Sequence, residues 1–154
     1  RFISDVLDEI VSLFPSPYIH IGGDEVHYGN QSWFTDPEIQ QFIKDKKLQN
    51  ETGLEHYFVN RAADIVASKG KTMIGWDEII DAGVSPGKAV VMWWRHDRKH
   101  QMVKALENGY QVIMTPRRRS MRISFNTENT MSVVCGMVTI RSKMCTVSPN
   151  LLSI

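Results

Sequence analysis

Cysteine is scarce in this 154-residue chain, and long apolar runs are absent from it. Its two cysteines, Cys135 and Cys145, show no close pairing that would suggest a zinc site or a disulfide framework. No run of about 18 apolar residues is present, so no membrane span is predicted. A charged start with a short apolar core and a cleavage site is also missing, so no signal peptide is visible. The content of 42% hydrophobic and 23% charged residues is ordinary for a globular domain that buries a core.

Acidic residues are scarce in one part of the chain only. Of the 18 Lys and Arg and 17 Asp and Glu, residues 117–154 hold six bases and a single acid. Residues 1–116 therefore hold 12 bases against 16 acids, a net charge of −4. Because this larger part is mildly acidic, we expect no nucleic-acid partner.

Four short apolar segments alternate with stretches of helical periodicity. We expect strands at 18–21, 71–76, 89–94 and 110–115, and helices at 2–14, 35–47, 53–70 and 98–109. Thr35 and Glu38 have the spacing of a capping box, with Pro37 in the first turn of the second helix. Strands separated by helices pair in parallel, and apolar strands are covered on both faces. The order predicts an α/β fold, either a doubly wound sheet or part of an eight-stranded barrel.

The segments after the first three expected strands are rich in acids and tryptophans. They read GGDEVH at 22–27, GWDE at 75–78 and WWRHD at 93–97. In α/β folds the active site gathers at the carboxyl ends of the strands. The position of these segments alone therefore predicts a functional site.

Two adjacent carboxylates, Asp24 and Glu25, follow the glycine pair of the first segment. Gly22 and Gly23 permit a sharp turn, and successive side chains on an extended backbone point apart. Glycoside hydrolysis ordinarily needs two carboxylates about 5 to 10 Å apart, which neighbouring residues rarely provide. In a substrate-assisted route, the acetamido oxygen of the sugar attacks, and the enzyme needs one acid/base and one carboxylate that orients the amide. An Asp-Glu pair suits that route.

The motifs HIGGDE (20–25) and GWDE (75–78), with Trp93 on the following strand, resemble the family 20 glycoside hydrolases, the β-N-acetylhexosaminidases. The resemblance covers residues 1–116 and implies a (β/α)8 TIM barrel, of which about strands 4 to 7 would be present. It implies hydrolysis of terminal N-acetylhexosamine (GlcNAc or GalNAc) residues with retention, through an oxazolinium intermediate. It implies no cofactor and no metal, a glycan or glycoconjugate as the partner, and a secreted or periplasmic location.

The resemblance also implies roles for single residues. Glu25 resembles the general acid/base, and Asp24 resembles the carboxylate that holds the acetamide N–H. Trp76 and Trp93 resemble walls of the pocket around the sugar ring.

The remaining polar residues of the motifs are weaker candidates for substrate binding. They are His20, Asp77 and Glu78, and His20 is better interpreted as a hydrogen-bonded support residue. We interpret Trp33 and Trp94 as packing residues, because tryptophans at strand ends often cap a core.

Residues 117–154 lack clear periodicity, and if their reading frame is shifted, this segment has no reason to fold. A frameshift is one hypothesis for it. The possible codons of residues 120–123 allow YAYF in a shifted frame, and those of residues 135–139 allow WNGY. Reading the gene across these codons tests the hypothesis, since an intact frame would overturn it.

Three alternatives stay open at this stage. The chain could be an inactive fragment or a carbohydrate-binding remnant of such an enzyme, and we expect its activity to be impaired. The diguanylate cyclases share GGDE, but their motif lies on a hairpin and ends in Phe, where Val26 stands here. A metal site from His20, Asp24, Glu25 and His27 would not have a standard ligand spacing.

Overall fold

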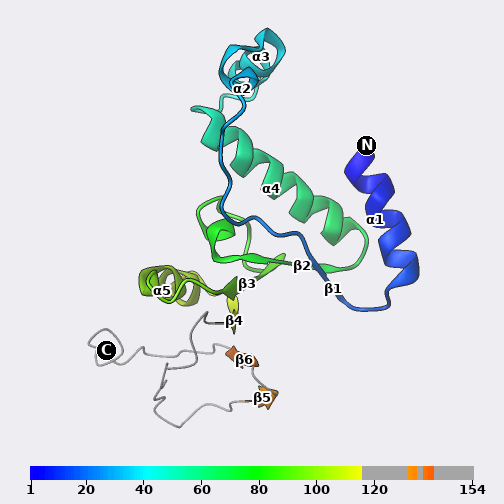
Figure 1. Ribbon diagram of the computed structural model, residues 1–154. Coiled ribbons are helices and arrows are strands. Elements are labelled where there is room, and N and C mark those ends of the chain that lie inside the picture. Colours follow the sequence, from blue (N-terminus) through cyan, green and yellow to red (C-terminus); the bar gives the residue numbers. More distant parts are fainter. Residues whose placement is uncertain (116–131, 135–136, 141–154) are drawn as a thin grey trace.

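The computed structural model describes residues 1–115, 132–134 and 137–140, and its centre is a sheet of six strands (Figure 1). The spatial order is β1-β2-β3-β4-β6-β5, and the first four strands are parallel. These four are β1 (Tyr18–His20), β2 (Thr72–Trp76), β3 (Ala89–Trp93) and β4 (Gln111–Met114). All four predicted strands are therefore confirmed, and the α/β fold with them.

Two further short strands extend the sheet beyond β4. β6 (Met137–Ile140) pairs antiparallel with β4, and β5 (Ser132–Val134) pairs antiparallel with β6. No strand was predicted in this part of the chain, so these two short strands are additions to the predicted sheet. The frameshift hypothesis falls largely on residues outside the described ones and stays a prediction.

The helices follow the predicted order, with two additions. The predicted ones are α1 (Phe2–Leu13), α3 (Pro37–Asp45), α4 (Glu51–Ser68) and α5 (Lys99–Glu107). The additions are a single turn, α2 (Ser32–Thr35), and the 3-10 turn η1 (Asp77–Ile80). Both are too short to give a periodic pattern in the sequence.

The predicted capping box at Thr35 is wrong, because Thr35 is the last residue of α2. Asp36 caps α3 instead, and its Oδ1 accepts hydrogen bonds from the backbone N–H groups of Glu38 (2.8 Å) and Ile39 (3.2 Å). Asn50 caps α4 in the same way, by accepting from the Gly53 N–H at 3.0 Å. Short polar side chains thus satisfy N–H groups that the first turn of a helix leaves unpaired.

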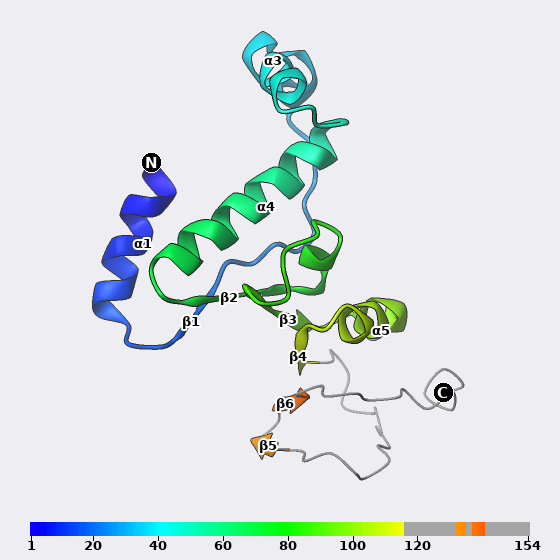
Figure 2. The same cartoon turned by 180° about the vertical axis from the view of Figure 1, so that it is seen from behind.

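The core lies between the sheet and the helices α4 and α5, which pack on one of its faces, and α1 packs against α4. α4 packs on β2, and α5 packs on β3 and β4, as the front and back views show (Figures 1 and 2). The buried side chains that meet in this layer include Leu7, Val59, Val66, Met73, Val91, Trp93, Met102, Ala105, Val112 and Met114. Burial of this apolar layer provides the main stabilisation of the fold.

The opposite face of the sheet is more open than the sequence predicted. On this face His20 is exposed, and Ile74, Trp76 and Met92 are only half-buried by the described residues. Side chains alternate between the two faces of a strand, so each strand sends every second residue to this side. Val90 is nevertheless buried on this face, so within the described part of the chain the prediction of strands covered on both faces holds fully for the helical side and in part for the other.

The pair α2 and α3 lies away from the sheet, beyond the N-terminal end of α4 (Figure 1). The Gln40 side chain ties this pair to its surroundings, because its Nε2 donates to the Trp33 carbonyl (2.8 Å) and to Glu51 Oε1 on α4 (3.1 Å). Within the described residues, no helix combines the length and the apolar character needed to cross a bilayer.

Candidate active site

The carboxyl ends of β1, β2 and β3 lie side by side at one edge of the sheet. The parallel register pairs His20 with Ile74 and Trp76 with Met92, so the three segments that follow these strands begin close together. These are the segments that the sequence singled out for their acids and tryptophans. The sheet therefore brings them to one place, as the topology predicted.

The segment after β1 turns sharply at its two glycines. Gly22 and Gly23 have φ values of 79° and 96°, and Glu25 has a φ of 47°. The turn continues the sheet, because the Trp76 N–H donates to the Gly22 carbonyl at 3.0 Å. A positive φ is uncommon for a residue with a Cβ, and such conformations concentrate at functional sites. The backbone thus holds Glu25 in a strained conformation directly after the turn.

The space that a side chain at Gly23 would occupy is already filled by protein. A Cβ at Gly23 would lie 2.9 Å from Ile79 Cγ2 of η1, closer than real Cβ atoms approach. The absence of a side chain there lets η1 pack against the turn.

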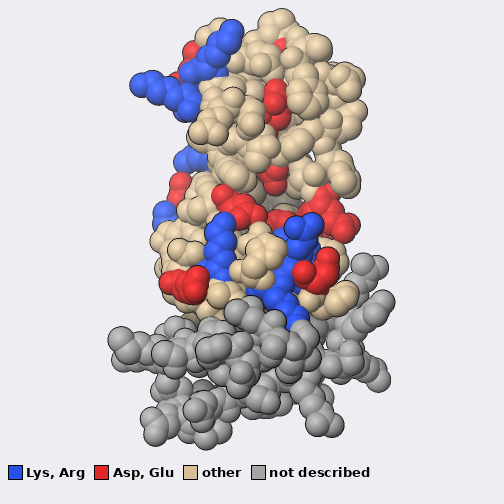
Figure 3. Space-filling view, turned by 90° about the vertical axis from the view of Figure 1, so that its left-hand side faces the viewer, with Lys and Arg blue, Asp and Glu red and all other residues tan. Residues whose placement is uncertain are grey.

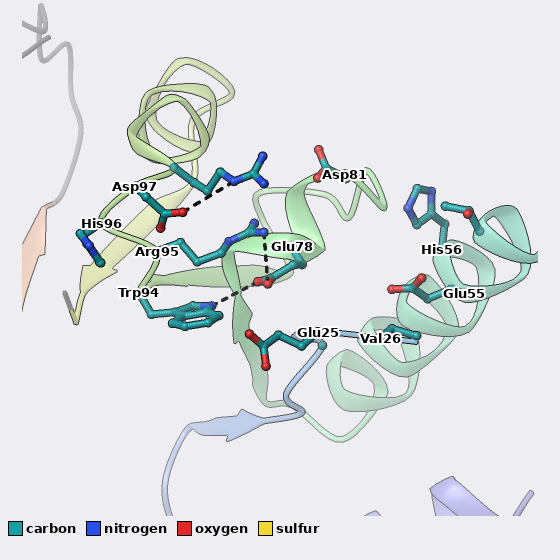
Figure 4. A pocket seen from close by; sticks show the side chains of 13 residues that line it. Glu25, Val26, Glu55, His56, Glu78, Asp81, Trp94, Arg95, His96 and Asp97 are labelled. Atoms are coloured by element: carbon teal, nitrogen blue, oxygen red, sulfur yellow. Dashed lines mark hydrogen bonds and ion pairs between the residues drawn. The ribbon is translucent and has the colours of Figure 1, made fainter. Parts of the chain in front are cut away.

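A pocket of about 600 Å³ opens beside this turn (Figure 4). Glu25 contributes to its wall from the first segment, Glu78 from η1, and Trp94 from the segment after β3. In Figure 4 the Glu25 carboxylate points to the side where Trp94 and Glu78 lie. The remaining lining residues are Gly23, Val26, Thr52, Glu55, His56, Asp81, Arg95, His96, Asp97 and Arg98. Its volume lies in the range of small-molecule sites.

Three aromatic rings form a row across the ends of β1, β2 and β3, and we call His20, Trp76 and Trp94 the aromatic row. The ring centres of His20 and Trp76 lie 5.0 Å apart, and those of Trp76 and Trp94 lie 6.3 Å apart, both edge to face. This geometry is favourable for aromatic pairs. The row joins the pocket at Trp94, which belongs to both.

His20 supports the turn that follows it. Its Nδ1 accepts a hydrogen bond from the Gly22 N–H at 3.0 Å, so the proton of the neutral ring is on Nε2. Partial burial lowers the pKa of His20 below 6.5, although the Asp24 carboxylate acts in the opposite direction. This contact agrees with the interpretation of His20 as a support residue.

A buried ion pair lies beneath the pocket. The Asp77 side chain is 0% exposed, and its Oδ2 accepts from Arg95 Nε at 2.8 Å and from Nη2 at 2.6 Å. Arg95 Nη1 also lies 3.4 Å from Glu78 Oε1. Burial of Glu78, together with the neighbouring Asp77 carboxylate, raises the pKa of Glu78 above 4.5, although Arg95 and Trp94 oppose the shift.

Trp93 and Trp94 have opposite environments. Trp93 is 0% exposed in the helix-covered core, and its Nε1 donates to the Arg98 carbonyl at 3.2 Å. Trp94 lines the pocket and belongs to the aromatic row. Alternation along the strand explains the difference, because Trp93 falls on the same face as Val91. The structure therefore places Trp94, which we interpreted as a packing residue, where the sequence predicted Trp93.

The other predicted site residues divide into four groups. Glu25 and Glu78 line the pocket, and Asp24 is exposed on the turn without contributing to the pocket wall. His20 and Trp76 lie beside the pocket in the aromatic row. Asp77 is fully buried and paired with Arg95, which lines the pocket. Asp77 therefore holds Arg95 in place, whereas the sequence predicted that it would contact the substrate.

Arg95 lies in the segment 93–97 but was not named as a site residue, and Glu55 and His56 on α4 are among the pocket residues outside the three segments. Arg95 directly follows Trp94, so its place at a strand end was a usable signal. Glu55 and His56 carried no such signal, because their helix looks like any amphipathic helix. Glu55 accepts a hydrogen bond from the Tyr28 hydroxyl, which fastens the long segment after β1 to α4.

Acidic and basic side chains alternate around this part of the molecule. In Figure 3 both kinds are gathered across the middle of one face. Asp81, for example, accepts from Lys104 Nζ (2.6 Å) and Gln101 Nε2 (2.9 Å). Among the described residues there is no group of three or more His, Cys, Asp or Glu that could hold a metal ion. The four residues considered for a metal site thus do not form such a group.

Comparison with known proteins identifies the family. Residues 1–142 match the sequence model of glycosyl hydrolase family 20, catalytic domain. The chain is 40% identical over 116 residues to a beta-hexosaminidase of Porphyromonas gingivalis, covering 75% of this chain and 14% of that protein. It is 31% identical over 117 residues to the human beta-hexosaminidase subunit beta, covering 74% of this chain and 21% of that subunit.

Solved structures give the same result. A beta-N-acetylhexosaminidase from Bacteroides fragilis matches with a TM-score of 0.64 and 31% identity, over 77% of this chain and 24% of that one. An exo beta-N-acetylglucosaminidase from Vibrio harveyi, in complex with N-acetylglucosamine, matches with a TM-score of 0.65 and 30% identity, over 75% and 18%. The chain spans a quarter or less of the length of these relatives. Its four parallel strands are part of a TIM barrel, and the chain belongs to the catalytic-domain family of the family 20 glycosyl hydrolases.

Proposed function

We propose that the protein hydrolyses terminal non-reducing N-acetylhexosamine residues of glycans or glycoconjugates. The observation that carries the proposal is the placement of Glu25, which lines the pocket beside Trp94 at the end of β1. Family membership supports the same reaction class. The aromatic row adds broad, flat surfaces of the kind that pack on the apolar face of a pyranose.

The reaction would be substrate-assisted and retaining. The acetamido oxygen of the sugar attacks the anomeric carbon, the bond to the leaving oxygen breaks, and Glu25 gives its proton to that oxygen. Glu25 then takes a proton from water, which attacks the anomeric carbon and opens the oxazolinium ring. Asp24 would hold the acetamide N–H during both steps. The adjacency of the two acids is useful here, because neither of them has to attack.

Carboxylate geometry supports this division of labour. Glu25 lines the pocket, whereas Asp24 is exposed on the turn outside the pocket wall, so the two side chains serve different sides of the turn. Within the described residues, no hydrogen bond or ion pair engages the Glu25 carboxylate, which leaves it available to a substrate. Trp94, rather than Trp93, would form the wall against the sugar.

We further propose that the activity of the 154-residue chain is impaired. Glu25 is exposed, and a general acid works best where water is excluded around it. If the protein were a carbohydrate-binding remnant, the same pocket would bind the sugar without hydrolysing it.

The requirement for the acetamido group tests the proposed mechanism. Nitrophenyl N-acetylglucosaminide should be hydrolysed with retention at the anomeric carbon, as followed by proton NMR of the first product. The matching nitrophenyl glucoside, which lacks the internal nucleophile, should not react. Comparable hydrolysis of both substrates, or an inverted product, would contradict the substrate-assisted route.

A further inference from the structure

The Trp94 indole makes a single hydrogen bond among the described residues. Its Nε1 donates to Glu78 Oε2 at 3.4 Å, and its ring meets Trp76 edge to face. Ring contact alone fixes distance poorly, because an indole can slide along its neighbour. The carboxylate of Glu78 therefore sets the orientation of this wall.

Glu78 itself is held between two segments. It is on η1 after β2, whereas Trp94 and Arg95 follow β3, so the contact joins two strand ends. Its two oxygens are divided, with Oε1 facing Arg95 Nη1 at 3.4 Å and Oε2 facing the indole. A single carboxylate thus fixes the cation and the ring relative to each other.

Arg95 is in turn held in place by Asp77. Its Nε and Nη2 both donate to the fully buried Asp77, which leaves Nη1 directed at Glu78. The second oxygen of Asp77, Oδ1, has no hydrogen-bond partner among the described residues, so Asp77 depends on Arg95. A buried carboxylate with one cationic partner holds that partner firmly, because separation would leave an unpaired charge in the core.

We propose that Glu78 is a positioning residue that fixes the Trp94 indole against Trp76 and thereby sets the aromatic wall of the pocket. Arg95, anchored by Asp77, holds Glu78 in place. Glu78 contacts no reacting atom in this account and acts through Trp94. The charged groups that face it are Asp77 on its own element and Arg95 from the segment after β3, and Glu25 and Asp81 line the same pocket.

The Trp76–Trp94 pair provides a direct readout. Two indoles 6.3 Å apart give an exciton-coupled circular dichroism signal, and Trp94→Phe assigns that signal to the pair. In the full chain, Glu78→Ala should reduce the signal to less than half. Glu78→Gln, which keeps an acceptor for the indole but loses the attraction of Arg95, should give an intermediate signal. Asp64→Asn is the control, because it removes the α4 carboxylate of an exposed ion pair with Lys88 and should leave the signal unchanged.

A purely structural role of Glu78 would give a different pattern. In that case Glu78→Gln would lower the melting temperature and leave the exciton signal of the Trp76–Trp94 pair unchanged. If Glu78 is a positioning residue, Glu78→Gln should change the exciton signal of the Trp76–Trp94 pair and should not lower the melting temperature at neutral pH. An unchanged exciton signal in both Glu78 variants would overturn the inference.

Measurement of sugar binding is a second test of the inference, and this test rests on the proposed function. By NMR titration, Glu78→Ala should weaken the binding of N-acetylglucosamine by about tenfold, the size expected when one aromatic contact with the sugar is lost. If wild type shows the exciton signal but binds no sugar, the proposed function is contradicted, and the spectroscopic arm still decides the role of Glu78. Unchanged sugar affinity in a Glu78→Ala variant with a lost exciton signal would overturn the part of the inference that concerns the pocket wall.

Discussion

Gly75 of β2 lies directly against Ile79 of η1, so that a Cβ at Gly75 would be 2.7 Å from Ile79 Cγ2 and 3.0 Å from Cδ1. The same Cγ2 also faces Gly23 across the turn after β1. Ile79 is 1% exposed and belongs to the core. The glycines of GGDE and GWDE thus make room for one buried side chain, which locks the two motif segments together.

The first prediction concerns this contact. Gly75→Ala should lower the free energy of unfolding by about 1–3 kcal/mol, because an added methyl group overpacks a filled site. Ile79→Ala should itself cost about 2–5 kcal/mol, but the double variant should lose less than the sum of the two single losses, because the clashing atoms are gone. Gly87→Ala is the matched control, because the nearest atom to a Cβ there is 3.9 Å away. Denaturant unfolding of the four variants measures the coupling, and additive effects of Gly75→Ala and Ile79→Ala would contradict the packing account.

The second prediction concerns the strained backbone at Glu25. Glu25→Gly should raise the free energy of unfolding by up to about 1 kcal/mol, because glycine adopts a positive φ without steric cost. Lys47 has a φ of 54° and is outside the pocket, so Lys47→Gly should stabilise the fold to a similar extent. Only the Glu25 variant should also lose sugar hydrolysis. Destabilisation by both substitutions in thermal unfolding would show that the strain is not released in this way.

The third prediction concerns pH. The folded state raises the pKa of Glu78 above 4.5, so it favours the protonated carboxyl relative to the unfolded chain. The contribution of Glu78 to stability is therefore full below its unfolded pKa and is lost as the pH rises through its folded pKa. Glu78→Gln should remove this dependence, so the difference in stability between variant and wild type should grow from acidic to neutral pH. A wild-type stability advantage that increases over this interval would contradict the sign.

The fourth prediction separates the two neighbouring tryptophans. Trp93→Ala should cost about 3–5 kcal/mol of stability, as expected for a large core side chain. Trp94→Ala should cost less, because that residue is only half-buried, but it should abolish detectable binding of N-acetylglucosamine. Thermal unfolding and NMR titration of both variants test the assignment. The opposite pattern would restore Trp93 as the pocket wall.

Much of the fold could be predicted because its signals are local. The periodicity of α1 and α4 and the four apolar strands identified the parallel sheet, and the strand ends identified the segments of the site. The Thr35 capping box failed because the four-residue helix α2, which has no period of its own, takes up Thr35 and leaves Asp36 as the cap. Strand β6 was missed because its partner β4 is distant in the sequence, and β5 was missed because it joins the sheet only through β6.

The site was predicted less well than the fold, for a physical reason. A motif identifies which residues are near a strand end, but the face of the strand decides which of them contact a ligand. Trp93 and Trp94 differ by one position and have opposite environments. Likewise, Asp77 and Glu78 are adjacent, yet one is sealed beneath the pocket and the other lines it.

The most direct test of the central claim is nitrophenol release from a nitrophenyl N-acetylglucosaminide by wild type and by Glu25→Gln. The account predicts slow release by wild type and a loss of about 10²–10⁴-fold in the variant, the usual contribution of a general acid/base. A dinitrophenyl leaving group needs no protonation, so its first release should be far less sensitive to Glu25→Gln. Equal rates for wild type and Glu25→Gln on the nitrophenyl substrate would contradict the account, and no release by wild type would favour a sugar-binding remnant.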